Sequence, residues 1–392
     1  MKINAIEKIK LFYIKNSKII KLFLINKSLI FVAAVIAILF FTQCPWANRS
    51  SDNIFINGWA QGDGKAYLWI AQYGYETDPA IWRDMTLNNF LPLYPILVRI
   101  IGMIFFNNFA LGGFLVSNLF SFIFVFYLYK LLQIDFKKKI SYRAVAFVLF
   151  FPTAFFFSAI YTESLFLALV VMSFYYARKG EWLKSSVIGM LLPITRIIGL
   201  FFFIPLFIEY MKQRDFHISK IDNKIFYFAF LFTGIALYFL FSFILNGTIL
   251  GYQDKNNTWG FELAPPHVAI VNEIRDINLA SISSIIYHSW NLFEIVLFSF
   301  LIIYCVYKKI NSSYVIYMII GFLLPLISSR LLGFSRYLII LFPAFLALSL
   351  LSFNKKYGKL IILMYILFAA MIIFLTARFV LFIPGDMINC IQ

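Results

Sequence analysis

The sequence has little charge and little cysteine. Only 13% of its 392 residues are Asp, Glu, Lys or Arg, whereas a soluble domain has about a quarter. That shortage excludes a soluble enzyme and a disordered tail protein, and three cysteines are too few for a disulfide-stapled secreted domain. The apolar runs also lack the two-residue alternation of a membrane β-barrel.

Apolar residues are abundant instead. They make up 62% of the chain, which includes 49 phenylalanines, and the mean hydropathy is +0.85. A compact core of this size cannot bury so much apolar surface, so much of it must face lipid. We expect an all-α polytopic membrane protein, with about eleven hydrophobic segments in a single integral-membrane domain over residues 28–392.

The formal net charge of +16 indicates orientation in a membrane and no nucleic-acid partner. Most Lys and Arg residues gather in short stretches between apolar runs, at 1–27, 130–143, 178–184, 211–224, 308–309 and 355–359. Basic loops stay on the cytoplasmic side. We therefore expect residues 1–27 to form a basic cytoplasmic arm. We expect the protein itself in the bacterial inner membrane or, in a eukaryote, in the endoplasmic reticulum membrane.

The acidic residues outside these stretches mark the opposite side. They predict a large first outer loop over 46–108, in which segment 90–106 lies at the interface or dips part-way in, and a second outer loop over 246–290. Segment 185–210 begins and ends beside basic stretches, and Pro193 and Arg196 interrupt it. Two half-helices meeting near Arg196 would satisfy the charge rule, because non-helical backbone is tolerated where it lines a protected cavity.

Polar groups near apolar runs are the candidates for chemistry, since they cost free energy in lipid. Asp63 lies between two glycines, which let the backbone turn tightly and a substrate approach; a solvated turn is the structural alternative. Thr162 and Glu163 could simply begin a helix as its cap and first turn. Interface arginines often snorkel to headgroups, but Arg196 lies in a segment that never becomes a surface loop.

Other chemistries find no support in the pattern. Trp59 and Ala66 occupy positions where a phosphate-binding P-loop needs Gly and Ser or Thr, and no G-x-G-x-x-G precedes a helix. The three histidines lack metal-ligand spacing. We expect no cofactor and no bound metal, although a divalent ion at Asp63 stays open.

Four blocks resemble the PIG-V family, the second mannosyltransferase of GPI-anchor assembly and its bacterial relatives, in the GT-C class. They are DGKAYLWIAQYGY (63–75), FLPLYP (90–95), FPTAFFFSAIYTESLF (151–166) and TRIIG (195–199). Gln253 with Trp259, and residues 335–337 with Pro343, match later family positions more loosely. The resemblance covers roughly residues 28–352. Gly62 and Ala66 depart from it, since many members have Trp and His there.

The resemblance implies a GT-C-like bundle and a sugar transfer on the outer side. The donor would be a polyprenyl- or dolichyl-phosphate sugar and the acceptor a lipid or glycan hydroxyl, among membrane lipids and with room for a small membrane partner subunit. Asp63 would be the catalytic base, and Arg196, Arg336 and Lys65 would bind the donor phosphate. Glu163 and Tyr161 would orient an acceptor or hold Arg196. The implied substrate-binding residues are Gln61, Tyr67, Tyr94, Tyr161, Glu163, Thr195, Gln253, Trp259 and Tyr337.

Two other classes remain open. A secondary transporter predicts ionisable residues near mid-membrane and a duplicated hydropathy pattern, neither of which is clear in this sequence. A lipid-linked glycan flippase would not need an acid in the first outer loop.

Overall fold

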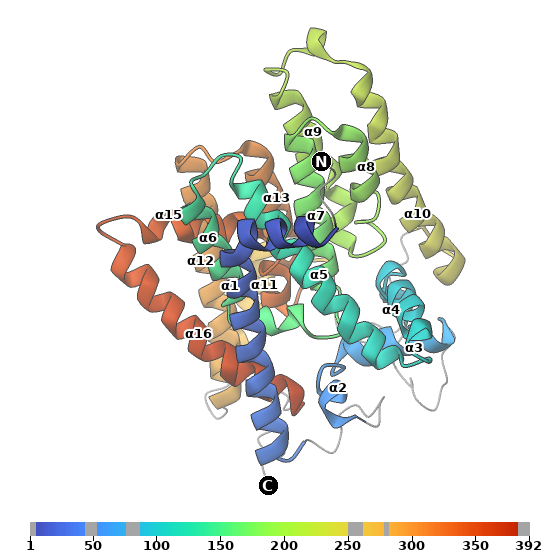
Figure 1. Ribbon diagram of the computed structural model, residues 1–392, viewed down its shortest axis with the longest axis vertical. Helices are drawn as coiled ribbons and strands as arrows, with labels where there is room; N and C mark the ends of the chain where they lie inside the picture. Colours follow the sequence, from blue (N-terminus) through green and yellow to red (C-terminus); the bar gives the residue numbers. More distant parts are fainter. Residues whose placement is uncertain (1–4, 44–52, 76–86, 250–261, 278–281, 383–392) are drawn as a thin grey trace.

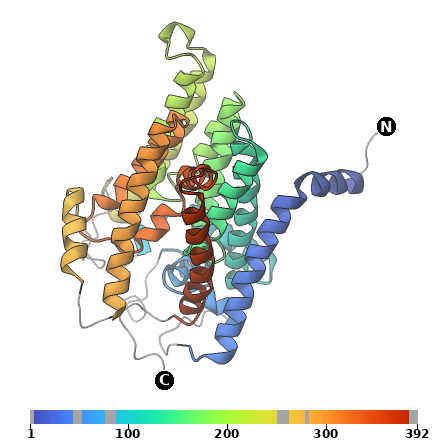
Figure 2. The same cartoon turned by 90° about the vertical axis from the view of Figure 1, so that its left-hand side faces the viewer.

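The computed structural model describes residues 5–43, 53–75, 87–249, 262–277 and 282–382. The regular secondary structure of these parts is helical, apart from one isolated bridge between Leu263 and Ser328. Figures 1 and 2 show an elongated bundle of helices of unequal length. The α-helices are α1 (Ala5–Phe40), α2 (Ile54–Gly58), α3 (Asp63–Tyr73), α4 (Leu93–Ile104), α5 (Phe109–Leu132), α6 (Lys138–Leu149), α7 (Glu163–Arg178), α8 (Trp182–Gly189), α9 (Phe203–Lys212), α10 (Phe228–Asn246), α11 (Pro266–Arg275), α12 (Ile282–Tyr307), α13 (Ser312–Leu326), α14 (Phe334–Leu338), α15 (Phe342–Ser352) and α16 (Gly358–Val380). Short 3₁₀ helices include η1 (Leu87–Asn89), η2 (Ala154–Phe157), η3 (Ile197–Phe201) and η5 (Asn223–Tyr227).

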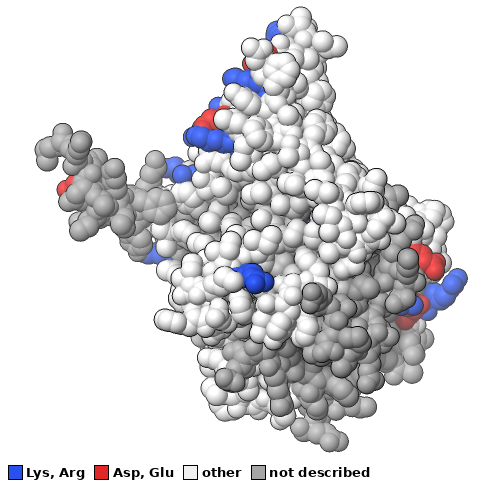
Figure 3. Space-filling model, turned by 90° about the vertical axis from the view of Figure 1, so that its right-hand side faces the viewer, with Lys and Arg blue, Asp and Glu red and all other residues white. Residues whose placement is uncertain are grey.

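Five helices of the described chain are long and apolar enough to cross a membrane, which makes this an integral membrane protein. They are Asn16–Phe40, Phe109–Leu132, Asn223–Asn246, Ser284–Tyr307 and Gly358–Val380. Leu93–Ile104, Ser312–Leu326 and Phe342–Ser352 are shorter apolar helices. Of the eleven or so expected segments, the others fold as short or broken helices packed within the bundle. On the face shown in Figure 3, described charged side chains gather at the margins, apart from one basic side chain near the centre.

One helix contains most of the expected arm over 1–27 and the first span. Helix α1 runs unbroken from Ala5 to Phe40, and Figure 2 shows its first turns projecting from the bundle. Its apolar part begins at Asn16, well before residue 28, where the expected membrane domain starts. Lys27 is buried, and its Nζ donates to Ser158 Oγ at 2.6 Å and to the Phe157 carbonyl at 3.3 Å. The partners of Lys27 therefore tie α1 to the segment just before α7.

Helix α7 lies in the middle of the bundle. Most of its side chains are buried, and it packs beside α5 and α8 (Figure 1). Small residues let its neighbours approach closely: a Cβ on Gly112 of α5 would lie 2.7 Å from the Gly102 nitrogen of α4, and one on Gly113 would lie 2.7 Å from Ile160. Helix α7 begins at Glu163 and ends at Arg178, so it joins the two polar ends of the bundle.

The broken segment 185–210 is confirmed as two half-helices. Helix α8 ends at Gly189, and the chain turns through residues 190–196 before η3 and α9. Helix α9 returns to the end of α7, since the Gln213 side chain donates to the Ala177 carbonyl at 3.0 Å. The turn is tight, because a Cβ on Gly199 would lie 2.3 Å from the Leu192 carbonyl carbon. Arg196 thus lies at the tip of a helical hairpin.

Candidate active site

A cavity of about 320 Å³ lies at the end of the bundle where this hairpin turns. Segments far apart in the sequence form its walls: the start of α3, η1, the turn before η3, the end of α10 and the loop into α14. Its volume is near the lower end of the range for small-molecule sites. Its polar lining comprises Asp63, Tyr67, Asn88, Asn89, Thr162, Thr195, Arg196, Tyr238, Ser242, Asn246, Arg336 and Tyr337.

Asp63 is fixed by the backbone around it. It is the first residue of α3, and Gly62 before it has φ +58°, a left-handed conformation that glycine adopts without strain. The Tyr161 hydroxyl donates to the Gln61 carbonyl at 2.9 Å and accepts from the Asp63 amide at 3.0 Å. A Cβ on Gly62 would lie 2.5 Å from that hydroxyl oxygen. Glycine and tyrosine together therefore set where the carboxylate of Asp63 points.

Glu163 joins the two arginines of the cavity. Its Oε1 accepts from Arg196 Nη1 at 2.8 Å and from Arg336 Nε at 2.7 Å. Arg336 Nη1 also donates to Asp63 Oδ2 at 2.5 Å. The charges alternate along this chain of contacts, so each guanidinium touches a carboxylate.

The side chain of Glu163 is completely buried. Burial by itself raises the pKa of its carboxyl, but the guanidinium groups of Arg336 and Arg196 outweigh burial and hold that pKa below its ordinary value of 4.5. Glu163 is therefore ionised at neutral pH. Its Oε2 has no hydrogen-bond partner among the described residues, which leaves one buried acceptor unused.

Aromatic rings and a hydroxyl hold the arginines in place. The guanidinium carbon of Arg336 lies 4.4 Å from the ring centre of Tyr161, and that of Arg196 lies 5.1 Å from the ring centre of Tyr337, both within cation–π range. Thr162 Oγ1 accepts from Arg196 Nη1 at 3.1 Å. Thr162 is the N-cap residue of α7 and Glu163 lies in its first turn, as expected, but the Thr162 side chain makes no capping hydrogen bond and binds Arg196 instead.

The structure brings together six of the expected site residues as lining of one cavity: Asp63, Tyr67, Thr195, Arg196, Arg336 and Tyr337. Two more lie directly behind them. The Tyr161 hydroxyl accepts a hydrogen bond from the Asp63 amide, and Glu163 accepts one from Arg196, which is one of the two arrangements expected of it.

Three other expected residues, Tyr94, Gln61 and Lys65, do not line the cavity. Tyr94 is fully buried, donates to the Gly113 carbonyl at 3.2 Å and lies 2.7 Å from Ser117 Oγ, so it packs α4 against α5. Gln61 is buried and its amide donates to the Asn57 carbonyl. Lys65 is exposed and outside the lining. Gln253 and Trp259 lie outside the described residues.

The sequence interpretation missed the wall formed by η1 and the end of α10. Asn88 Nδ2 donates to Asn246 Oδ1 at 2.9 Å and to the Leu245 carbonyl at 3.3 Å, which closes one side of the cavity. The available signal was weak: Asn88 and Asn89 directly precede the FLPLYP block, and Asn246 ends a long apolar run. The described residues hold no group of three His, Cys, Asp or Glu side chains suited to a metal ion.

The site and the fold define an integral membrane protein with a buried network of opposite charges at one end of a helical bundle. No protein-family model matches the chain, and no curated protein matches it. Among solved structures, it is similar to the crystal structure of the Archaeoglobus fulgidus oligosaccharyltransferase tethered with an acceptor peptide. The identity is 13% and the TM-score 0.43, over 91% of this chain and 55% of that one. The chain thus spans about half the length of that enzyme, and so remote a similarity identifies neither a family nor an activity.

Proposed function

We propose that the protein is an integral-membrane glycosyltransferase of the GT-C type. It would transfer a sugar, mannose by its resemblance to the PIG-V family, from a polyprenyl- or dolichyl-phosphate donor to a hydroxyl of a lipid or glycan acceptor on the extracytoplasmic side. The observation that carries the proposal is that Asp63, Arg196 and Arg336 line one cavity. A carboxylate and two fixed guanidinium groups are the chemistry that such a transfer requires.

The arginines suit a departing lipid phosphate. As the bond between the anomeric carbon and the phosphate oxygen breaks, negative charge grows on the phosphate. Guanidinium groups bind phosphate oxygens in a bidentate fork, and Glu163 and the aromatic rings already hold both arginines in place. Groups fixed in advance stabilise the developing charge without reorganisation.

Asp63 suits the general base. It would accept the proton of the acceptor hydroxyl as that oxygen attacks the anomeric carbon. Its Oδ2 is held by Arg336, and its Oδ1 makes no hydrogen bond to the described part of the chain, so a hydroxyl can approach that oxygen. A base acts only within hydrogen-bond reach, which the placement of Asp63 on the cavity wall permits.

The other polar walls suit sugar hydroxyls. Tyr67, Thr195 and Tyr337 would bind the sugar or the acceptor, together with Asn88 and Asn89. Lys65 and Tyr94 have no part in this proposal, since neither lines the cavity. A lipid-linked donor reaches the site through the membrane, so the proposal requires no nucleotide-binding domain and no resident cofactor.

A donor comparison with the purified protein tests the proposal. The protein in lipid nanodiscs is incubated with candidate lipid and glycan acceptors and with radiolabelled polyprenyl-phosphate mannose, polyprenyl-phosphate glucose or GDP-mannose. We expect transfer from polyprenyl-phosphate mannose and none from the nucleotide sugar. Transfer from the glucose donor alone would keep the class and change the sugar. A lack of transfer from every lipid-phosphate sugar would contradict the proposal and favour a transporter or a flippase.

A further inference from the structure

A second cavity, of about 580 Å³, lies at the end of α7 away from the candidate active site. Four of the basic stretches meet there, although they are far apart in the sequence. Its charged lining comprises Asp135, Arg178, Glu209, Lys212, Lys308 and Lys309. The mechanism proposed above uses none of these residues.

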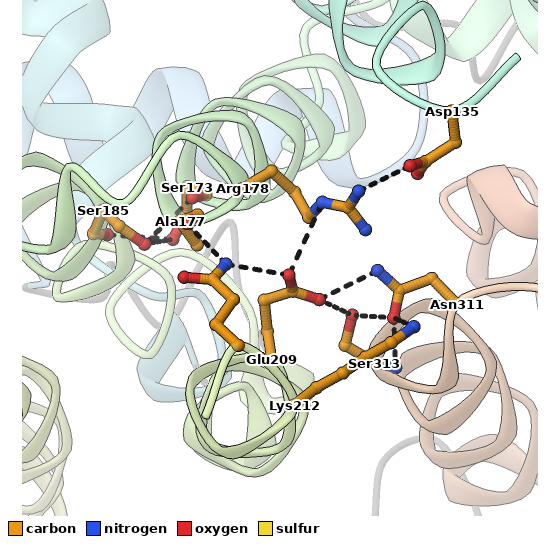
Figure 4. Close-up of polar contacts among 10 residues, drawn as sticks. Asp135, Ser173, Ala177, Arg178, Ser185, Glu209, Lys212, Asn311 and Ser313 are labelled. Atoms are coloured by element: carbon orange, nitrogen blue, oxygen red, sulfur yellow. Dashed lines mark hydrogen bonds and ion pairs between the residues drawn. The ribbon is translucent and has the colours of Figure 1, made fainter. Parts of the chain in front are cut away.

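Hydrogen bonds and ion pairs connect the buried polar side chains at the floor of this cavity (Figure 4). Glu209 is 1% exposed, and its Oε2 accepts from Asn311 Nδ2 at 2.9 Å and from Ser313 Oγ at 2.8 Å. Its Oε1 lies 3.5 Å from Arg178 Nε. Arg178 Nη2 donates to Asp135 Oδ1 at 2.5 Å. Two carboxylates thus fix one guanidinium in a defined orientation.

The rim of the cavity includes two lysines that have no carboxylate partner in the described chain. Lys308 and Lys309 are exposed, and neither lies within ion-pair distance of a carboxylate in the described chain. Lys212 has an amide partner, since its Nζ donates to Asn311 Oδ1 at 3.1 Å. Lys309 adopts φ +50°, a left-handed conformation that residues other than glycine rarely adopt. With four basic and two acidic side chains, the lining keeps an excess of positive charge.

We propose that this cavity binds the phosphate group of an anionic ligand. A fixed guanidinium and exposed lysine ammonium groups that line one cavity are hydrogen-bond donors suited to a phosphate group. By the charge rule this end of the bundle faces the cytoplasmic leaflet, where anionic lipids attract basic residues. A lipid headgroup is therefore one source of the phosphate and a soluble phosphate compound is the other.

Binding is measured on the purified full-length protein in detergent micelles by isothermal titration. The probes are dioctanoyl phosphatidylglycerol, dioctanoyl phosphatidylcholine, glycerol 3-phosphate and inorganic phosphate. The variant Lys308→Gln/Lys309→Asn removes two rim charges, and Asn is used at 309 because it tolerates the left-handed region. The matched control is Lys138→Gln/Lys139→Asn, which removes two exposed charges of the same end from outside the cavity lining.

We expect saturable binding of phosphatidylglycerol, with phosphatidylcholine much weaker. The rim variant should weaken the binding about tenfold, since each basic residue near an anionic surface contributes on the order of a fivefold effect before screening. The control variant should change it less than about twofold by the same screening. Equal or tighter binding of the soluble phosphates would support the site and assign it to a soluble ligand.

Two results would overturn the proposal. Equal losses in the rim and control variants would show diffuse surface attraction instead of a site. No saturable binding of any anionic probe to the wild-type protein would show that the cavity binds no phosphate. Neither result depends on sugar transfer, so this proposal and the proposed function fail independently.

Discussion

Replacement of Glu163 by Gln is expected to damage both stability and activity. The carboxylate is fully buried and accepts one hydrogen bond from each of two guanidinium groups, at 2.8 Å and 2.7 Å. Glutamine keeps the shape and loses the charge, so the buried guanidinium of Arg196 no longer has a carboxylate partner in the described chain. Only neutral acceptors remain for it, such as the Thr162 hydroxyl. Removal of one partner from a buried ion pair costs about 3–5 kcal/mol.

The lower end of that range applies at this site. Arg336 keeps its ion pair with Asp63 and is 19% exposed, so only Arg196 loses its carboxylate completely. We expect a loss of about 3 kcal/mol and an apparent Tm lower by about 5 °C. Transfer should fall by at least about 100-fold, because the phosphate-binding groups lose their orientation.

The pH dependence provides a separate readout for Glu163. Its pKa is lower in the folded protein than its ordinary value of 4.5, so the stabilising effect is complete above about pH 4.5 and is lost as the pH falls through the folded pKa. The difference in Tm between wild type and Glu163→Gln should therefore be constant from pH 7 to 5 and shrink below pH 4.5.

Thermal unfolding followed by intrinsic fluorescence, together with the transfer assay, measures these effects. The matched control is Glu181→Gln, which removes a carboxylate from an exposed ion pair with Lys184 and should change little. Equal Tm values and equal transfer rates for the two variants would refute the role given to Glu163.

Two further predictions concern the turn that positions Asp63. Gly62→Ala should lower the free energy of unfolding by about 2 kcal/mol or more, because the residue has φ +58° and the new Cβ meets the Tyr161 hydroxyl. The control Gly180→Ala, with φ +71° and nothing within 4 Å, should cost only about 1 kcal/mol. Equal losses for the two variants in denaturant unfolding would refute the close approach of Gly62 and Tyr161. Tyr161→Phe should lower kcat about 10- to 100-fold with a smaller effect on KM, because the Asp63 amide and the Gln61 carbonyl lose their hydrogen-bond partner. An unchanged kcat would show that the Tyr161 hydroxyl does not position the proposed base, Asp63.

Local sequence features predicted much of the fold. Long apolar runs predicted the long apolar helices, and the charge rule predicted the break near Arg196. Both features are determined by the residues of the segment itself and need no distant contact. The start of α1 could not be predicted in this way. In the sequence Lys27 resembles part of a basic arm, whereas in the structure it is buried and contacts Phe157 and Ser158 across the bundle. The short helices α6 and α8 also depend on tertiary packing, since neither is long enough to span a bilayer by itself.

The sequence identified some of the residues that line the cavity and missed others. Asp63, between two glycines, and Arg196, in an interrupted apolar segment, are unusual in apolar surroundings, so their residue types indicated them as candidates, and both line the cavity. Tyr94 belongs to a conspicuous block but lies buried against Ser117, and a tyrosine in a motif does not reveal which side of a helix faces a cavity. The sequence does not indicate Asn88 as part of the site, because its partner, Asn246, is distant in the sequence.

The transfer rate of Asp63→Asn tests the central claim most directly. The substitution keeps the size of the side chain and removes the base, and Asp135→Asn is the matched control because it also removes a carboxylate paired with an arginine. With polyprenyl-phosphate mannose as donor, the account predicts that Asp63→Asn loses transfer by at least about 100-fold while Asp135→Asn transfers at nearly the wild-type rate. Transfer by a folded Asp63→Asn protein at the rate of the Asp135→Asn control would contradict it.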